Sequence, residues 1–383
     1  MTEVIVVGAG PAGLGLTAEL RRHGVDVVLL EQRTQRRPGS RAIGVHPPAL
    51  AALEPSGVTD RLLADAVRIR RGIAVCAGRQ LGEVRFDGRA GRYAFVASVP
   101  QAVTEAALAA GAPEPFWGAE AHRVVDDGDG VRVQCHTQRG EIEFRALAVV
   151  IAAGAAGRAL AGPIARPHGG PYGDRYLMTD LPDAPGLPAD TAILTLDRAG
   201  IVESFPLPRG GRRLVAWDRS PPGGDSGPAR VERLRRAVAE RTGDEALAGR
   251  IQEATSFGIR RVLLRRLRRG RVLAIGDAAH EVSPIGGQGM NLGLLDAVTL
   301  APQLTSWLRD PDADEGLDQW ERSRLLSART AARLASLNTA IGRARSAPAH
   351  AAASGGVRWA ARSPLARVAA RAYTMGFDRS ALS

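Results

Sequence analysis

The sequence contains no lysine, so all 51 of its basic side chains are arginine. This absence excludes Schiff-base chemistry, a catalytic lysine and a phosphate-binding loop that ends in Gly-Lys-Thr or Gly-Lys-Ser. The formal net charge of +11 would suit an anionic partner such as nucleic acid or a phosphate-rich cofactor. Because arginine stands in for lysine throughout, we favour biased composition as the source of this charge and expect no nucleic acid.

Cysteine is also scarce, with only Cys76 and Cys135 in 383 residues. Two cysteines cannot build a disulfide framework or, by themselves, a zinc site, so we expect no metal. They fit a reducing cytoplasm. The start, residues 1–3, lacks the basic region and long apolar run of a targeting segment, and no stretch approaches the ~20 apolar residues of a membrane span. The sequence therefore predicts a cytoplasmic protein without stable membrane insertion.

The first forty residues have the pattern of a dinucleotide-binding unit. Residues 4–7 are a β-branched run typical of a buried parallel strand, and Gly8-Ala9-Gly10-Pro11-Ala12-Gly13 follows at once. Residues 12–23 have helical apolar spacing, and residues 25–30 form a second apolar run that ends at Glu31. Strand, glycine motif, helix, strand and terminal acid are thus all in place, which a chance glycine-rich turn would not provide.

Each residue type in this unit has a physical role. Gly8 permits the tight turn, Gly10 lets the backbone approach a pyrophosphate, and Gly13 lets the helix pack closely on the sheet. The helix N-terminus offers N–H groups and partial positive charge to the phosphates. Glu31 is placed to accept both ribose hydroxyls and would repel a 2′-phosphate, which favours FAD or NAD over NADP.

A second motif lies far downstream. Residues 271–275 predict a short strand, followed by Gly276-Asp277-Ala278-Ala279-His280, then Pro284-Ile285-Gly286-Gly287-Gln288-Gly289-Met290-Asn291 and a helical segment over 291–308. Together with the first motif, this pattern resembles the class A flavoprotein monooxygenases, the para-hydroxybenzoate hydroxylase-like family. The resemblance implies an α/β fold: a Rossmann-like (GR2-type) FAD-binding domain with a parallel sheet, a β-sheet substrate domain and C-terminal helices.

The resemblance also implies roles for single residues. Asp277 would hydrogen-bond the ribityl chain of FAD, and the loop 286–289 would lie beside the isoalloxazine, with Asn291 helping to begin the next helix. Arg41 and Gln101 match segments that contact the cofactor, although a surface arginine and a helix-start glutamine are plain alternatives. The full set of expected FAD contacts is Gly8, Gly10, Pro11, Ala12, Gly13, Glu31, Gln32, Arg33, Arg41, Gln101, Gly276, Asp277, Pro284, Gly286, Gly287, Gln288, Gly289, Met290 and Asn291.

The resemblance covers about residues 1–310 and implies a discontinuous domain organisation. We expect an FAD-binding domain over 1–65, 98–165 and 265–310, a substrate-binding domain over 66–97 and 170–264, and a helical C-terminal segment over 311–383. We interpret the arginine-rich stretch 260–271 as a solvated connector, because no aromatic residues interleave with it as in a nucleic-acid patch. The arginine- and alanine-rich tail could touch an anionic membrane, but we favour helices packed on the body.

One stretch departs from the family. Residues 149–158 match a strand followed by Asp-Gly, near a serine and an arginine, that the family associates with FAD and NAD(P)H. Here Ala153 replaces the aspartate, Gly154 is retained, and Gly157 replaces the serine. The electron donor, NADPH or NADH, is therefore uncertain, whereas the FAD motifs are intact.

The resemblance predicts an FAD-dependent monooxygenase that uses O2, through a flavin C4a-hydroperoxide, to hydroxylate or epoxidise a small aromatic, polyketide-like or other apolar substrate. Such a pocket needs apolar walls that exclude water. His46 and the strand residues Tyr93, Phe205 and Trp217 are candidates, each equally compatible with plain core, and no catalytic residue is identified. The alternatives are an oxidase, dehydrogenase or reductase on the same fold and a non-enzymatic flavin-binding scaffold. A halogenase is disfavoured by the absence of lysine. The oligomeric state is open.

Overall fold

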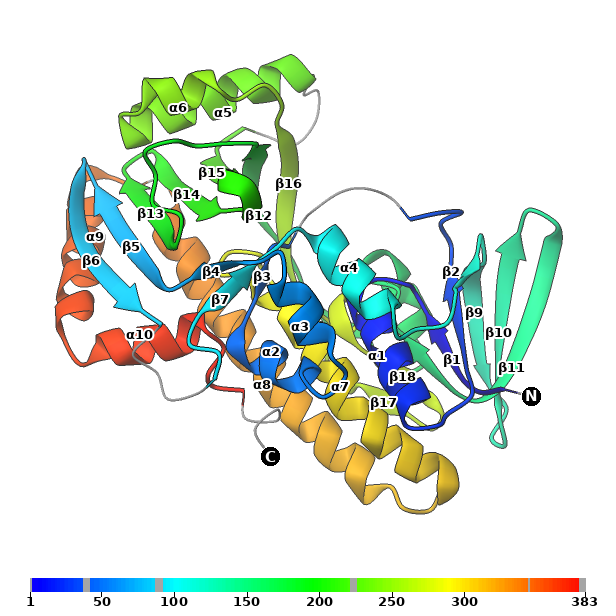
Figure 1. Cartoon of the computed structure of the whole chain (residues 1–383). Helices are drawn as coiled ribbons and strands as arrows, with labels where there is room; N and C mark the ends of the chain where they lie inside the picture. The colour runs from blue at the N-terminus through cyan, green and yellow to red at the C-terminus, as the bar shows by residue number, and fades with distance from the viewer. Residues whose placement is uncertain (1, 37–41, 87–91, 221–225, 344, 379–383) are drawn as a thin grey trace.

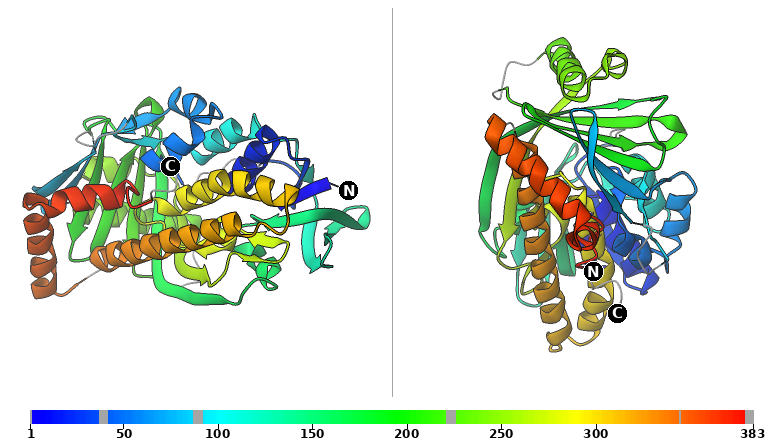
Figure 2. Two further views of the ribbon diagram at one scale, coloured as in Figure 1. Left: turned by 90° about the horizontal axis from the view of Figure 1, so that it is seen from below. Right: turned by 90° about the vertical axis from the view of Figure 1, so that its left-hand side faces the viewer.

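The computed structural model describes residues 2–36, 42–86, 92–220, 226–343 and 345–378 (Figure 1). Within these ranges the chain forms two eight-stranded sheets, a three-stranded sheet and ten α-helices. The two large sheets lie in different halves of the molecule, and long helices near the C-terminus run between them (Figures 1 and 2). This architecture confirms the α/β fold with a parallel sheet, a second sheet and C-terminal helices.

The first sheet contains the expected strand–helix–strand unit. Its central strands β1, β2, β11 and β18 run parallel, as expected for apolar runs buried on both faces. In spatial order the strands are β17 (Arg268–Arg269), β18 (Val272–Ala274), β11 (Gly140–Ile151), β1 (Thr2–Val7), β2 (Val27–Glu31) and β8 (Phe116–Trp117), with β10 (Val131–Thr137) and β9 (Glu120–Asp126) extending it beside β11.

Helices α1 (Pro11–Arg22) and α7 (Gln288–Arg309) pack against each other beside this sheet. Their buried leucines, Leu14, Leu16 and Leu292 among them, join the β-branched strand residues in the largest apolar core. The helices α2 (Pro47–Leu53), α3 (Val58–Leu63) and α4 (Gln101–Ala109), the strands β3 (Gly44–Val45), β7 (Val96–Ser98) and β4 (Val67–Ile69) of the small sheet, and the 3₁₀ turns at 156–161 and 276–278 complete this half.

The second sheet is mostly antiparallel and has two different faces. One face packs its apolar side chains against α5 (Gly227–Thr242) and α6 (Glu245–Gly249). The opposite face, which includes Tyr176 and Ile201, meets Ile341 and Val357 of the C-terminal helices. In spatial order the strands are β19 (His280–Glu281), β16 (Thr255–Leu264), β12 (Pro167–Leu181), β15 (Arg212–Asp218), β14 (Gly200–Pro206), β13 (Thr191–Asp197), β5 (Arg71–Cys76) and β6 (Arg79–Arg85), with a 3₁₀ turn at 208–210.

The C-terminal segment consists of α8 (Glu315–Gly342), α9 (Ala347–Arg362) and α10 (Leu365–Tyr373). Helix α8 runs alongside α7, and α9 and α10 pack against β6 (Figure 2). The approach is close, since a Cβ on Gly82 of β6 would lie 2.1 Å from the Cβ of Ala361. The tail therefore packs on the body. None of the described helices combines the length and the hydrophobicity that crossing a membrane requires.

The arginine-rich stretch 260–271 corrects one expectation. It is not a connector, because residues 260–264 belong to strand β16, which pairs with β12 on one side and β19 on the other. Ile259, Val262 and Leu264 are buried while Arg260 and Arg261 are exposed, so exposed arginines and buried apolar residues are interspersed along a packed strand. Their number obscured the apolar positions in the sequence.

Candidate cofactor site and adjoining cavity

The first glycine motif divides into two structural glycines and one open position. Gly8 has φ +107°, and a Cβ there would lie 2.6 Å from the carbonyl oxygen of Ala152. A Cβ on Gly13 would lie 1.8 Å from the carbonyl oxygen of Gly8. A Cβ on Gly10, which precedes α1, would meet no described atom within 4 Å. Chain packing thus requires Gly8 and Gly13, whereas Gly10 leaves space for a phosphate at the helix N-terminus.

Glu31, at the end of β2, is buried beside this turn. Its Oε2 accepts a hydrogen bond from the Ala9 N–H at 2.8 Å, and its Oε1 accepts from the Arg33 N–H at 2.9 Å and from Arg33 Nε at 3.0 Å. Burial favours the neutral acid, but the hydrogen bonds from Arg33 and Ala9 outweigh it and lower the pKa of Glu31. The carboxylate stays ionised, as a ribose acceptor must. Gln32, next to it, is exposed.

The second motif meets the first, although about 270 residues separate them. Gly276 has φ +61°, and a Cβ on it would lie 3.1 Å from the Cβ of Ala12 in α1. Gly293 of α7 approaches the same methyl group, at 3.2 Å. Asp277 is exposed, and a Cβ on Gly289 would lie 3.8 Å from its Oδ1. The acidic side chain therefore lies at the first turn of α7, close to the N-terminal half of α1.

The glycine-rich loop ends in a left-handed residue that begins α7. Gly286 and Gly287 have φ +98° and +67°, conformations that side chains disfavour, and the helix starts at 288 rather than at the expected Asn291. Asn291 fixes the loop instead. Its Nδ2 donates to the carbonyl oxygens of Gly44 and Gly287 at 2.8 and 2.9 Å, and its Oδ1 accepts from the His46 N–H at 2.8 Å.

Other expected cofactor contacts have partners within the chain, differ in burial or cannot be placed. The side chain of Gln288 is buried, and its Nε2 donates to the carbonyl oxygen of Ala372 in α10 at 3.1 Å. Gln101 donates to Glu105 Oε1 at 2.8 Å and accepts from the Ala42 N–H at 3.3 Å. Arg41 lies outside the described residues. Pro11, Ala12 and Met290 are half-buried in the first turns of α1 and α7, and Pro284 is exposed before the glycine loop.

Arg158 contacts the second motif, and sequence reasoning assigned it no role. It is 9% exposed, and its Nη2 donates to the carbonyl oxygen of Asp277 at 2.7 Å and to Glu281 Oε2 at 2.8 Å. The guanidinium therefore holds the backbone of Asp277 from outside the glycine motifs. The only available signal was its place at the end of the stretch 149–158, where the family has an arginine.

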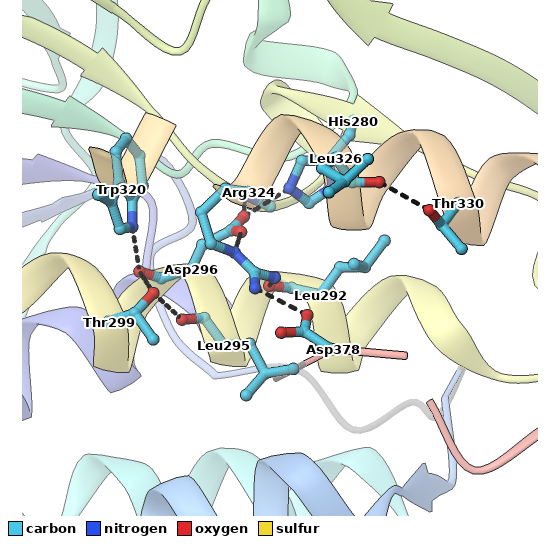
Figure 3. A network of polar contacts seen from close by, with 11 residues as sticks. His280, Leu292, Leu295, Asp296, Thr299, Trp320, Arg324, Leu326, Thr330 and Asp378 are labelled. Atoms are coloured by element: carbon cyan, nitrogen blue, oxygen red, sulfur yellow. Dashed lines mark hydrogen bonds and ion pairs between the residues drawn. The ribbon is translucent and has the colours of Figure 1, made fainter. Parts of the chain in front are cut away.

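A fully buried charge network contacts the Gly276 turn through Asp296 (Figure 3). Asp296 of α7 accepts from His280 Nε2 at 2.5 Å, from the Gly276 N–H at 3.0 Å and from Arg324 Nε at 2.7 Å. Arg324 of α8 also donates to Asp378 at 2.7 Å. Burial alone would lower the pKa of His280, but the Asp296 carboxylate reverses this and raises it. His280 is therefore structural, as part of the support for Gly276.

An apolar cavity of about 70 Å³ adjoins the glycine loop on the side of the second sheet. Its polar groups are Glu203 of β14, Asn338 of α8 and Tyr373 of α10, and the remaining lining residues are Ala74, Leu194, Leu196, Ile201, Ile285, Ile341 and Val357. Ile285 belongs to the glycine loop itself. A larger hollow of about 220 Å³ lies between α7 and α8 and is lined by none of the motif glycines. The smaller cavity is therefore the better substrate candidate.

The four pocket residues expected from the sequence do not line this cavity. Tyr93 is not in a strand but precedes β7, and it packs edge-on against Phe95 in the main core. Trp217 donates from its indole to Asp174 Oδ1 at 3.0 Å. Phe205 packs near Tyr373 in a separate apolar cluster. Aromatic residues on strands serve the core as readily as a pocket, and the three aromatic residues have such contacts here.

His46 lies at the glycine loop rather than in the cavity. It is 4% exposed, and a Cβ on Gly287 would lie 3.3 Å from its Nε2. Burial lowers the pKa of His46 to about 4, so the imidazole is neutral. Its Nδ1 has no hydrogen-bond partner among the described residues.

Three potential metal ligands cluster on the surface, although no metal was expected. His122, His136 and Glu141 lie on neighbouring strands β9, β10 and β11. The imidazole rings stack with centroids 4.0 Å apart, and Glu141 Oε1 lies 3.7 and 3.4 Å from the two histidines. The three side chains are exposed, and exposed acidic groups of this kind are common without an ion.

The residues at the converging motifs fit FAD. Gly10 leaves a cradle that a Cβ would fill, the first turn of α1 points its N–H groups there, and the ionised Glu31 carboxylate lies at the end of β2. A family model described as an FAD binding domain matches residues 1–335. The chain belongs to this family.

Named relatives agree with this assignment. An anhydrotetracycline monooxygenase from Streptomyces rimosus is 32% identical over 337 residues, covering 84% of this chain and 66% of that protein. The chain thus spans about two thirds of the length of the curated relatives it matches.

Solved structures agree on the fold. The p-nitrophenol 4-monooxygenase of Pseudomonas putida superposes with a TM-score of 0.86 at 23% identity, covering 100% of this chain and 98% of that one. A Diels-Alderase of pyrroindomycin biosynthesis superposes with a TM-score of 0.79 at 24% identity, covering 98% of this chain and 80% of that one. The same fold therefore carries proteins named for different reactions, and the activity must be argued from the site.

Proposed function

We propose that this protein is an FAD-dependent monooxygenase that uses O2 to hydroxylate or epoxidise a small aromatic or polyketide-like substrate. One observation carries the proposal: the glycine loop that begins α7 borders both the converging FAD motifs and a mostly apolar cavity. A relative 32% identical is named as an anhydrotetracycline monooxygenase, which supports the same reaction class.

The chain's own residues would bind and orient the cofactor. The N–H groups at the start of α1 would bind the phosphates, Glu31 would accept from the ribose hydroxyls, and Asp277 would accept from the ribityl chain. Arg158 and the Asp296 network keep the Gly276 turn in place. FAD itself supplies the oxygen chemistry when bound. The protein's remaining task is to hold the substrate beside the loop and to exclude water, which the apolar cavity walls favour.

The electron donor belongs to the same proposal. NADPH or NADH would reduce the flavin, although Ala153 stands where the family has an acid. This change favours a second candidate, an oxidase or dehydrogenase that takes electrons from its own substrate. A cytoplasmic location, predicted from the cysteine content, would give access to the nicotinamide pool.

Flavin analysis and labelled oxygen test the proposal. The purified protein should be yellow with about one FAD per chain, and the flavin released on denaturation should run as FAD. Oxygen from ¹⁸O2 should appear in the organic product by mass spectrometry. A colourless protein or one that releases FMN contradicts the cofactor assignment, and label found only in peroxide would favour the oxidase.

A further inference from the structure

Glu203 is a buried carboxyl group without a partner in the part of the chain that the structure describes. It is 4% exposed, and among the described residues neither a hydrogen bond nor an ion pair of its carboxyl group is found. Along β14 it shares a face with Ile201, which also lines the cavity next to the glycine loop. Buried polar groups are nearly always hydrogen-bonded, because leaving one unpaired is costly. This exception calls for a ligand that completes it.

The groups that face Glu203 are neutral. Tyr176 of β12 and Tyr373 of α10 both lie near Glu203. Burial is the main cause that raises the pKa of both phenols, and the nearby Glu203 charge raises it further. Asp174 and Arg343, whose charges act on Tyr176, pair with each other at 2.6 Å. Burial raises the pKa of Glu203 to about 7, and no charge among the described residues offsets this effect. The carboxyl group can therefore gain or lose a proton near neutral pH.

The other polar contact in the cavity leaves Glu203 available. The Tyr373 hydroxyl donates to Asn338 Oδ1 at 3.3 Å, so this contact does not involve Glu203. Leucine and isoleucine side chains form most of the remaining wall. The cavity, at about 70 Å³, is smaller than the ~150 Å³ of an apolar cavity that binds benzene. It suits the edge of a ring and one substituent, with the rest of the substrate outside.

We propose that the cavity binds the hydroxyl-bearing edge of a phenolic substrate and that Glu203 accepts the hydroxyl proton. The substrate O–H bond breaks, an O–H bond forms on Glu203, and the electron pair stays on the substrate oxygen. That pair enriches the ring at the ortho and para carbons, where an electrophilic oxygen would attack. The proton returns to the oxygen of the product. The proton transfer stands on the cavity alone, whereas its use in oxygenation rests on the proposed function.

Binding of two isosteric probes tests the proton acceptor without requiring turnover. Phenol and toluene differ only in hydroxyl against methyl, and each is titrated into the FAD-loaded full chain while the flavin absorbance is followed between about pH 5 and pH 9. The variants are Glu203→Gln and, as a matched control, Asp180→Asn. Asp180 is a carboxylate of the same sheet that already pairs with Arg213 at 2.6 Å.

We expect the wild type to bind phenol about tenfold more tightly than toluene above neutral pH, since a hydrogen bond to a charged acceptor has that effect. The preference should fall several-fold as the pH drops below about 7 and the acceptor is protonated. Glu203→Gln should keep only a small, pH-independent preference, and Asp180→Asn should behave like the wild type. A wild-type preference that is absent or does not change with pH overturns the proposal, even if Glu203→Gln fails to fold. Failure of the ¹⁸O2 assay would instead overturn the proposed function and leave this result standing.

Discussion

The two halves of the molecule bury charge in opposite ways. Behind the Gly276 turn, Asp296 contacts His280 and Arg324, and Arg324 contacts Asp378, so every charge in the network has a partner. In the second sheet, Glu203 is equally buried and has no partner among the described residues. A buried carboxylate without a partner destabilises the folded state, whereas the partners of a paired carboxylate offset the cost of its burial.

This difference in pairing distinguishes buried charges that stabilise the fold from a buried carboxyl group that can take part in chemistry. A satisfied network resists change and holds a backbone turn in place, here the turn that carries Asp277. An unsatisfied carboxyl group that lines a cavity retains the capacity to bind or to exchange a proton. The comparison therefore predicts that removing Asp296 destabilises the fold, whereas removing the Glu203 charge stabilises it.

The largest effect is expected for Asp296→Ala. This change leaves His280 without its acceptor and removes one of the two carboxylates that pair with Arg324, all in the interior. Breaking a buried pair in this way costs about 3–5 kcal/mol, to be measured as the free energy of unfolding in urea. Asp312→Ala, at an exposed position between α7 and α8, should change stability by less than about 0.5 kcal/mol. Similar values for the two variants would contradict the support role.

Glu203→Gln should change the free energy of unfolding in the opposite direction and stabilise the fold. The folded-state pKa of Glu203 is raised from 4.5 to about 7. Its contribution to stability is therefore fully present below about pH 4.5 and is lost as the pH rises to about 7, a change of roughly 3 kcal/mol. The glutamine variant lacks this loss, so its stability relative to wild type should rise over that window in urea titrations. Glu253→Gln, an exposed control, should show a flat difference. A flat difference for Glu203→Gln would mean that its carboxyl group is not buried unpaired.

Sequence patterns predicted the cofactor half because its signals are local. The turn at Gly8, the helix that packs at Gly13 and the strand that ends at Glu31 lie within thirty residues of one another, and the spacing alone specifies their geometry. Gly276 and Asp277 form a comparably compact motif. Residues that act through contacts between distant segments, such as Arg158 and Asp296, carried no such pattern.

The cavity could not be predicted for the same reason. Glu203 lines it with Tyr373, and 170 positions of chain separate the two. One signal was present, because the two-residue period of a strand places Glu203 on the same face as Ile201 and Phe205, where a charge is unusual. The search for aromatic residues favoured Trp217 instead, whose indole is already bound to Asp174.

Asp277→Ala should lower FAD affinity more than Asp180→Ala. Asp277 is exposed at the first turn of α7, where the family places the ribityl chain, and losing one charge-assisted hydrogen bond costs about 1.5–3 kcal/mol, or about tenfold or more in affinity. Asp180 lies in the second sheet, away from the motifs. Flavin content per chain, measured by absorbance after dialysis, checks the difference. Equal retention in the two variants would contradict the placement of FAD at this motif.

The smallest expected effect concerns the rate at which a nicotinamide reduces the flavin. Ala153 lies between β11 and the turn that holds Arg158, and a Cβ on Gly157 would lie only 2.2 Å from its own Cβ. The absence of a side chain at Gly157 therefore leaves room for the Ala153 methyl group. We expect slow flavin reduction by NADPH or NADH when no substrate is present, and a faster rate in Ala153→Asp if the acid assists the nicotinamide. Anaerobic stopped-flow absorbance of the oxidised flavin band measures both rates, with Ala153→Asn as the neutral control of similar size. Rapid bleaching of the wild type, or equal acceleration by asparagine, would show that the missing charge has no part in reduction.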